Sequence, residues 1–329
     1  MESPTVTIVI VVYNRRDELR ETLRRMLVES DYDPKRVDAI VVDNASHDGS
    51  ATMVREEFPQ VRLIERATNA GAPAWNDGFA IAGGDYVLIL DDDCYLEPDG
   101  LRRAVAAAEE HASDLVSFRV VSTRDPRWVF SDRYPTGLLS FWGCAWLVRR
   151  SALEDLGGYD PHIFMWGNEL DFTIRSYDRG YRHLHLPEVV AHHMKGPGST
   201  DGTQDPMVYR VDARHHAYVA AKLLRPRDAS AVLAALMARS VNHGLRVDRA
   251  ALVGVPSAIR GFAHGIRRRR PVRSRELSRR YRRDFHTFVS PLQLTRRRRE
   301  RFFADRADLY PRERAVLDFR RDRSRGGRD

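Results

Sequence analysis

Four short runs of β-branched and other apolar residues recur in the first 90 residues, with helix-like stretches between them. The runs cover residues 6–12, 39–42, 61–65 and 86–90, and the third of them also contains Arg62 and Glu65. A continuous apolar run of this length is typical of a strand buried on both faces, and its alternation with helices favours a parallel sheet. The sequence therefore predicts an α/β fold in which flanking helices cover a mainly parallel sheet.

Polar residues cluster where these predicted strands end. They are Asn14 and Arg15 after the first run, Asp43 after the second, Asn69 and Gly71 after the third, and Asp91, Asp92 and Asp93 after the fourth. Ligands of open α/β sheets bind outside the carboxyl ends of the strands. We therefore expect these residues to share one site.

The aspartate triplet carries the most specific chemistry of that edge. Three adjacent carboxylates repel one another, and a divalent cation relieves the repulsion. In an Asp-x-Asp arrangement the first and third side chains can coordinate a hard cation together with substrate phosphates. The alternative interpretation is a hydrated acidic loop, but the position directly after a buried strand favours the metal site.

The remaining sequence suggests where the domain ends. Residues 195–205 are rich in Gly, Pro, Ser and Thr, which is typical of a boundary. We predict a catalytic domain over 1–204, with a nucleotide-binding part in about 1–100 and an acceptor part in about 101–204. Residues 205–329 are predicted to form a basic, helical C-terminal region.

Charge is distributed unevenly between these parts. Residues 205–329 hold 32 Lys and Arg against 13 Asp and Glu, whereas residues 1–204 hold 22 against 33. An acidic catalytic part suits a divalent cation, and a basic tail suits an anionic membrane surface or an acidic partner.

The only two cysteines, Cys94 and Cys144, imply no disulfide framework. The apolar runs are shorter than a membrane helix requires, and no secretory signal is recognised, so we expect a cytoplasmic protein that is peripheral at the inner face of the plasma membrane.

Several motifs together resemble the large family 2 of inverting glycosyltransferases, which includes bacterial rhamnosyl- and galactofuranosyltransferases. The matching segments cover roughly residues 5–193 and read VTIVIVVYNRRDEL, IVVDNASHDGS, NAGAPAWNDGFAIAGGDYVLILDDD and GCAWLVRRSALEDLGGYDPHIFMWGNELDFTIR, with YRHLHLPEVVAHH at the end. The resemblance implies a GT-A fold, a nucleotide-diphosphate sugar as donor, and Mn²⁺ or Mg²⁺ as cofactor. It also implies transfer to an acceptor hydroxyl with inversion, as in a hexosyltransferase.

The resemblance assigns roles to the strand-end residues. Asn14 and Arg15 would lie near the base and ribose, Asp43 would accept from the base imide, and Asn69 with Gly71 would let the backbone approach the nucleotide. Asp91 and Asp92 would contribute to donor binding. Asp91, Asp93 and His193 would hold the metal, although a histidine that ends a strand is often structural.

The same resemblance locates the general base in the segment around residues 167–171. An inverting transfer needs one carboxylate to take the proton of the attacking hydroxyl. Many relatives carry Glu-Asp where this chain has Asn168-Glu169, and the Asp of that pair is the base. Glu169 is therefore the predicted base and Asp171 the second candidate; the alternative is an acidic first helical turn that complements the helix dipole.

The acceptor and the rival functions stay open at this point. The acceptor could be lipid-linked, a polysaccharide or a small molecule in the synthesis of a cell-envelope polymer, a glycolipid or a glycosylated metabolite, and the sequence does not specify the oligomeric state. The arginine runs at 267–270 and 296–299 follow no nucleic-acid-binding motif, and the apolar stretch before the first run suits an interfacial helix. The alternatives are a nucleotidyltransferase of related fold, or a noncatalytic protein that binds membrane or nucleic acid.

Overall fold

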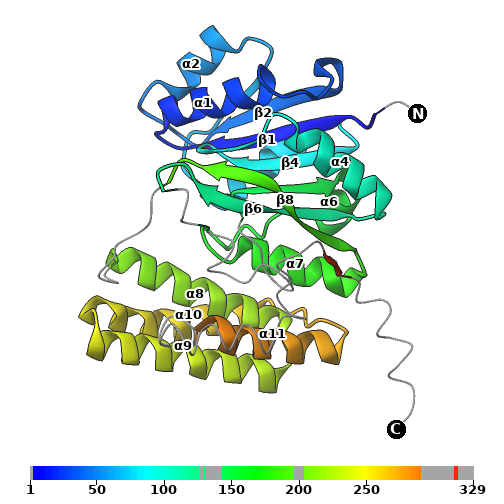
Figure 1. Cartoon of the computed structure of the whole chain (residues 1–329). Helices are drawn as coiled ribbons and strands as arrows, with labels where there is room; N and C mark the ends of the chain where they lie inside the picture. The colour runs from blue at the N-terminus through cyan, green and yellow to red at the C-terminus, as the bar shows by residue number, and fades with distance from the viewer. Residues whose placement is uncertain (1–2, 126–128, 130–142, 196–203, 290–314, 318–329) are drawn as a thin grey trace. The chain divides into compact units, whose positions relative to one another are not determined.

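The computed structural model describes residues 3–125, 129, 143–195, 204–289 and 315–317 (Figure 1). The chain divides into two compact units. The first consists of Met1–His162, Gly180–Pro197 and Pro311–Asp329, and the second of Ile163–Arg179 and Gly198–Tyr310. Residues 163–179 thus group with the later helices, so the compact units do not coincide with the functional division at residue 204, which stays a prediction. The predicted boundary segment lies mostly outside the described residues.

A single sheet forms the centre of the first unit. Its strand order is β3-β2-β1-β4-β7-β6-β8-β5, with β9 paired to β8. Strands β1 to β4 pair in parallel, as predicted, whereas β7, β5 and β9 pair antiparallel with their neighbours and β6 runs parallel to β8. The strands are β1 Val6–Val12, β2 Val37–Asp43, β3 Arg62–Glu65, β4 Tyr86–Asp91, β5 Cys94–Leu96, β6 Leu115–Ser122, β7 Ala145–Arg149, β8 His183–His193 and β9 Ala315–Leu317.

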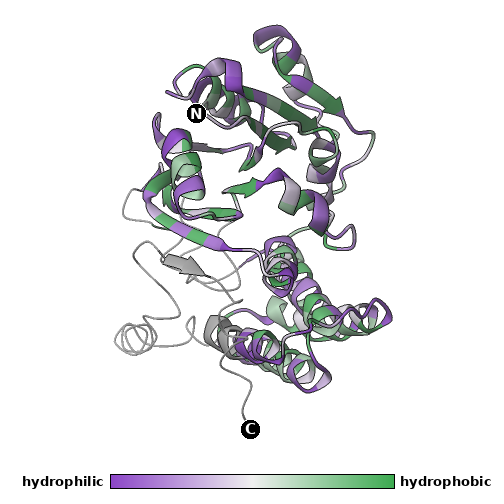
Figure 2. Cartoon of the chain, turned by 90° about the vertical axis from the view of Figure 1, so that its right-hand side faces the viewer, coloured by the Kyte–Doolittle hydropathy of each residue, from purple (hydrophilic) through white to green (hydrophobic). Residues whose placement is uncertain are grey.

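Helices cover both faces of this sheet because its strands are apolar on both faces. Leu19, Leu23 and Met26 lie at helical spacing on α1 and join the core cluster with alternate residues of β1. On the opposite face, Gly78 of α3 lies directly against the side chain of Val9. Figure 2 shows the central strands in hydrophobic green, whereas the flanking helices alternate between green and hydrophilic purple. These helices are α1 Arg16–Leu27, α2 Ser50–Glu57, α3 Trp75–Phe79, α4 Gly100–Glu110 and α6 Arg150–Leu156, with short 3-10 turns η1 Pro34–Arg36 and η2 Ala72–Ala74.

The second unit is helical. Its helices are α7 Asn168–Arg179, α8 Pro206–Leu223, α9 Pro226–Arg246, η3 Arg249–Val253, α10 Gly254–Arg267 and α11 Arg275–Val289. Helical structure after residue 205 was predicted, and it is confirmed as far as Val289. Residues 290–314 and 318–329, which include the second arginine run, lie outside the described residues. Among the helices that the structure describes, none is both long and apolar enough to cross a bilayer.

The structure differs in three places from what the local sequence pattern favours. The pattern of residues 72–82 favours one helix, but they form a 3-10 turn, η2, followed by the short α3. Pro73 lies in the first turn of this segment, where proline is tolerated, and Gly78, a poor helix former, lies next to the last residue of α3. The apolar residues of 181–186 and 189–193 favour two short strands, but they belong to one strand, β8, whose pairing with β6 shifts register between Phe118 and Arg119. Strand β5 was not predicted, because three residues are too few to show a periodicity.

Candidate active site

The loops that follow β1 and β2 are connected by hydrogen bonds at the predicted edge of the sheet. Asn14 adopts a positive φ of 55°, its amide N–H donates to Ser46 Oγ at 3.0 Å, and its side-chain oxygen accepts from the His47 N–H at 2.7 Å. Asp43 is buried, and its Oδ1 accepts from the Ser46 N–H at 2.9 Å. The structure therefore brings Asn14 and Asp43 together through Ser46, as the strand order requires.

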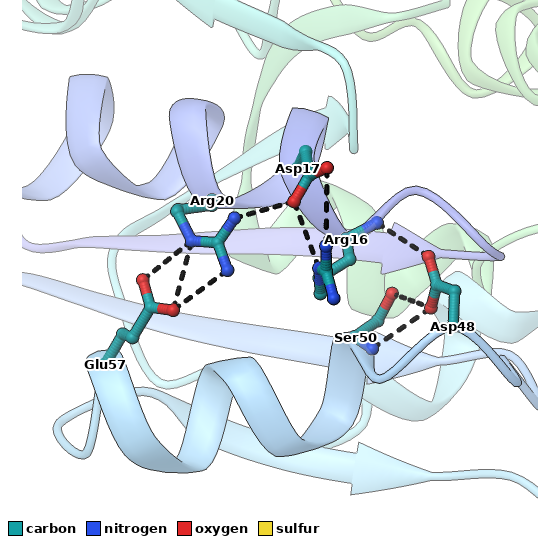
Figure 3. Close-up of polar contacts among 6 residues, drawn as sticks. All are labelled: Arg16, Asp17, Arg20, Asp48, Ser50 and Glu57. Carbon is teal, nitrogen blue, oxygen red and sulfur yellow. Dashed lines mark hydrogen bonds and ion pairs between the residues drawn. The ribbon is translucent and has the colours of Figure 1, made fainter.

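A second set of contacts anchors the same loops to the helices behind them (Figure 3). Asp48 accepts from the backbone N–H of Arg16 at 2.8 Å and from the N–H of Ser50 at 3.0 Å. Arg20 of α1 bonds to both Asp17 and Glu57. Exposed ion pairs of this kind contribute little stability individually, about 0–1 kcal/mol. The hydrogen bonds of Asp48 fix the first turns of α1 and α2 next to the site, and Arg20 connects α1 to the last residue of α2.

The turn between β3 and η2 is organised by Asn44, a residue for which no role was predicted. Its side chain donates to Asn69 Oδ1 at 2.9 Å and accepts from the Ala70 N–H at 2.9 Å. Asn69 Oδ1 also accepts from the N–H of Gly71, whose φ is 65°, at 2.8 Å. Asn69 and Gly71 therefore do form a turn, and it is attached to the end of β2. The available sequence signal was an asparagine directly after a predicted strand.

Strand β5 brings the predicted metal ligands together. Asp91 ends β4, Asp92 and Asp93 form a turn, and β5 then pairs antiparallel with β8 so that Cys94 lies opposite His193. His193 Nε2 lies 3.0 Å from Asp93 Oδ1. Ligand atoms of Asp91, Asp93 and His193 all lie within 4.8 Å of one another, which makes them a candidate metal group. Two carboxylates and an imidazole are donors that suit Mn²⁺, so the residues present fit a divalent cation.

Asp92 lies outside this group and has a different set of contacts. Its Oδ2 accepts from the Tyr13 N–H at 3.3 Å, and its backbone oxygen accepts from the Thr22 hydroxyl at 2.9 Å. Arg15 Nη1 bonds to Asp92 Oδ1 at 3.2 Å and also pairs with Asp93. Asp92 therefore attaches the aspartate turn to the loop after β1, and Arg15 lies against the acidic cluster.

The electrostatics of the cluster follow from burial and crowding. Burial, together with the neighbouring Asp93 carboxylate, raises the pKa of Asp91 to about 6. Burial raises the pKa of Asp92 well above its usual value, against the opposing charge of Arg15. Burial also acts on Asp93, but its hydrogen bond with His193 and the nearby charge of Arg15 hold its pKa below the usual value. The site thus concentrates negative charge that a bound cation would balance.

The two candidate bases lie in the first turn of α7, which belongs to the second unit. The Asp171 side chain is fully buried: its Oδ1 accepts from Lys222 Nζ at 2.6 Å and its Oδ2 from Arg175 Nε at 2.8 Å. The Glu169 side chain is partly exposed, and its backbone oxygen accepts from the Thr173 hydroxyl at 2.6 Å. Both carboxylate oxygens of Asp171 are therefore engaged in ion pairs inside its own unit.

Comparison with known families matches residues 7–157 to the model described as glycosyl transferase family 2. Residues 7–157, somewhat less than half of the chain, therefore match family 2 of the glycosyltransferases. The matched segment holds both loops after β1 and β2 and the aspartate turn, while His193 and α7 follow it in the sequence. The predicted family resemblance is confirmed, and the match favours glycosyl transfer over nucleotidyl transfer.

Individual relatives agree with this family 2 assignment. Glycosyltransferase AglE of Haloferax volcanii is 26% identical over 209 residues, covering 59% of this chain and 68% of that protein. The undecaprenyl-phosphate 4-deoxy-4-formamido-L-arabinose transferase of Edwardsiella ictaluri is 34% identical over 110 residues. That match covers 32% of this chain and 34% of that protein, so the chain spans from about a third to about two thirds of these relatives.

The fold of the family 2 domain is also found in solved structures. The mannosyltransferase PcManGT from Pyrobaculum calidifontis, in complex with GDP-Man and Mn²⁺, matches with a TM-score of 0.54 and 21% identity. The match covers 88% of this chain and 85% of that one. At this identity the likeness establishes the fold, and the predicted GT-A fold is confirmed.

Proposed function

We propose that this chain is a metal-dependent inverting glycosyltransferase that moves a hexose from a nucleotide-diphosphate donor onto an acceptor hydroxyl. The observation that carries the proposal is the convergence of Asp91, Asp93 and His193 next to the strand-end loops of a family 2 domain. A hydrated acidic loop would not need a histidine from a different strand within bonding distance of its third carboxylate, Asp93.

Asp91, Asp93 and His193 would hold the cation, which supplies Lewis-acid stabilisation of charge on the diphosphate leaving group. Arg15 adds a permanent positive charge beside the same carboxylates. Asp43 and Asn14, held by Ser46, would contact the base and ribose, and the turn of Asn69 and Gly71 would let the backbone approach the nucleotide. The role of Asp92 would be to keep the loop after β1 in place against the aspartate turn.

Glu169 is the proposed general base. The base must stand on the acceptor side of the sugar, opposite the leaving diphosphate, so the metal-binding aspartates are unsuited to the role. The ion pairs of Asp171 with Lys222 and Arg175 favour a structural part for Asp171, because taking a proton would break two charge-assisted bonds inside the protein. Glu169 is partly exposed in the first turn of α7, where its carboxylate is accessible to solvent.

The acceptor and the location are proposed from the relatives and the charge of the chain. One relative is named for undecaprenyl phosphate, which supports a lipid-linked or other cell-envelope acceptor. We place the enzyme at the inner face of the plasma membrane, where the basic C-terminal region would meet anionic lipid.

The test is a panel of nucleotide sugars incubated with the full chain, with release of the nucleoside diphosphate as the readout. We expect turnover of one donor class with Mn²⁺ or Mg²⁺, its disappearance with a chelator, and its return when metal is restored. Mass spectrometry of products formed on cell-envelope extracts would identify the acceptor. Undiminished turnover in chelator would contradict metal dependence, and no turnover of any donor under any metal condition would contradict the proposed activity.

A further inference from the structure

Helix α10 packs with its small residues inward and leaves its large apolar residues outside. Gly254, Ala258, Gly261 and Gly265 are buried, and a Cβ atom at Gly261 or Gly265 would collide with backbone carbonyl oxygens of α8. Close approach of the two helix backbones therefore fixes which face of α10 is inward. This orientation is the reverse of an ordinary amphipathic helix, whose large apolar stripe faces the core.

The outward stripe consists of Val255, Ile259, Phe262 and Ile266, spaced at i, i+4, i+7 and i+11 along α10. Ile259 and Ile266 are each 49% exposed, and Val255 and Phe262 are partly exposed. Single exposed apolar residues are ordinary, but a continuous stripe on one helix indicates a surface that contacts something else.

The charged residues that flank this stripe in the sequence all have one sign. Residues 249–275 contain eight arginines and no aspartate or glutamate. On α10 and just after it, the exposed arginines are Arg260, Arg267, Arg268 and Arg270. Arg269 differs from them, because its guanidinium donates to the carbonyl oxygens of Ala221 at 3.0 Å and Leu224 at 2.6 Å and so caps the end of α8.

We propose that the outward stripe of α10 and its flanking arginines form a docking surface for an anionic lipid bilayer. An exposed apolar stripe bordered by arginines is the arrangement that lies in a bilayer interface, with apolar side chains in the acyl boundary and cations at the headgroups. A second copy of the chain related by a two-fold axis would bring the two arginine groups together, which electrostatics opposes. Nucleic acid would pair with the arginines but gain nothing from Ile259 and Ile266.

This inference deepens the proposed membrane location of the enzyme. It is tested without donor or acceptor, so its failure can be told apart from a failure of the proposed transferase activity. The assay is co-sedimentation of the full chain with phosphatidylcholine vesicles that contain or lack phosphatidylglycerol. We expect binding only to the anionic vesicles, weakening as salt rises.

Two sets of variants separate the apolar and the charged contributions. Ile259→Ser with Ile266→Ser should weaken binding about tenfold or more. The matched control is Ile81→Ser in the first unit, a residue 44% exposed, which should leave binding unchanged. Arg267→Gln, Arg268→Gln and Arg270→Gln should each cost up to about fivefold at low salt, while Arg269 is kept because it caps α8.

A spectroscopic readout checks insertion directly. A polarity-sensitive fluorophore on Ile259→Cys should report an apolar environment when anionic vesicles are added, and one on Ile81→Cys should not; Cys94 and Cys144 are buried and do not compete for the label. Equal binding to neutral vesicles, or full binding by the Ile259→Ser and Ile266→Ser variant, would overturn the proposal. The proposal would also be overturned if the chain bound no vesicles but formed a dimer that the Ile259→Ser and Ile266→Ser variant loses. Binding of duplex nucleic acid without binding of vesicles would overturn it as well.

Discussion

At the scale of single residues, the sharpest test of the metal site is Asp93→Ala. Asp93 contacts both His193 and Arg15, so its removal should disperse the group that would hold the cation. We expect turnover to fall by at least about 10²-fold, the range seen when one electrostatic contact at a reaction centre is lost. Mn²⁺ affinity, followed by electron paramagnetic resonance, should fall with it.

Asp92→Asn is the comparison for that variant. Asp92 bonds to the loop after β1 and lies outside the candidate metal group, so its Mn²⁺ affinity should stay within a fewfold of the parent protein. A thermal melt establishes that each variant is folded. If folded Asp93→Ala binds Mn²⁺ as well as the parent, the assignment of Asp93 as a ligand is wrong.

Glu169→Gln tests the general base. The substitution keeps the size and hydrogen bonding of the side chain but removes its ability to accept a proton, so kcat should fall by about 10²–10⁴ while donor binding changes little. Asp171→Asn should act differently. It leaves Lys222 and Arg175 without their buried counter-charge, a change that costs about 3–5 kcal/mol, and so it should lower the melting temperature.

The two readouts decide between the candidates. A folded Glu169→Gln protein with normal kcat, beside an Asp171→Asn protein that melts normally but is inactive, would move the base to Asp171. The intermediate case is informative as well: if Asp171→Asn lowers kcat only in proportion to the unfolded fraction, Asp171 acts through structure alone.

Site residues could be predicted from the sequence where several reactive side chains follow one strand. They were harder to predict where their position depends on contacts between distant parts of the chain. The aspartate turn follows a buried strand, and that pattern alone indicates a site. His193 was placed near it only by resemblance, because the pairing of β5 with β8 is a long-range contact that no local pattern encodes. Asn44 received no role, since its importance comes from three hydrogen bonds to a turn 25 residues later.

At the scale of secondary structure, continuous apolar runs identified β1, β2 and β4, because these strands are buried on both faces. Apolar residues at helical spacing identified the amphipathic α1. Strands β5 and β9, which have three residues each, gave no such signature. The break predicted within β8 came from Pro187 and Glu188, which in the structure fall where the pairing with β6 changes register. Turn-forming residues therefore mark an irregularity in that strand, not its end.

Strand β8 also predicts how stability responds to pH. Burial lowers the pKa of His183 to about 3 and that of His185 to about 4, and His185 shares a 3.0 Å hydrogen bond with Ser117. Between these values and the unfolded pKa near 6.5, the unfolded chain binds protons that the folded chain excludes. The stabilising contribution is therefore complete above about pH 6.5 and is lost as pH falls, on the order of 2 kcal/mol for each histidine by about pH 4.5.

The measurement is chemical denaturation of the full chain at pH 7 and near pH 4.5. His183→Leu with His185→Gln should reduce the loss of stability between the two pH values, whatever it does to stability at pH 7. His162→Gln, an exposed histidine in the first unit, is the control and should leave the pH dependence as it is. An identical pH dependence in the double variant would show that other groups cause the acid sensitivity.

At the scale of the whole chain, charge and packing divide the molecule differently. The acidic part predicted over 1–204 and the basic part over 205–329 are a property of composition. Packing instead groups α7 with the later helices, since Asp171 of α7 pairs with Lys222 of α8. No sequence pattern indicates that ion pair, because its two residues lie 51 positions apart and each lies on a helix with several other charged residues.

A fragment that ends at residue 204 tests which division governs folding. It keeps every strand of the sheet except β9, so the amides of β1 and β4 should stay protected in hydrogen exchange. It removes α8 and with it Lys222, which leaves Asp171 as a buried charge paired with Arg175 alone and deprives α7 of the helices of its unit. Protection of the α7 amides should therefore fall more than about tenfold relative to the full chain.

The Lys222→Met substitution in the full chain should also lower the protection of the α7 amides, while the protection of β1 and β4 stays unchanged. If α7 is as protected in the fragment as in the full chain, residues 1–204 fold as one domain and the packing of α7 with α8 contributes little to its stability.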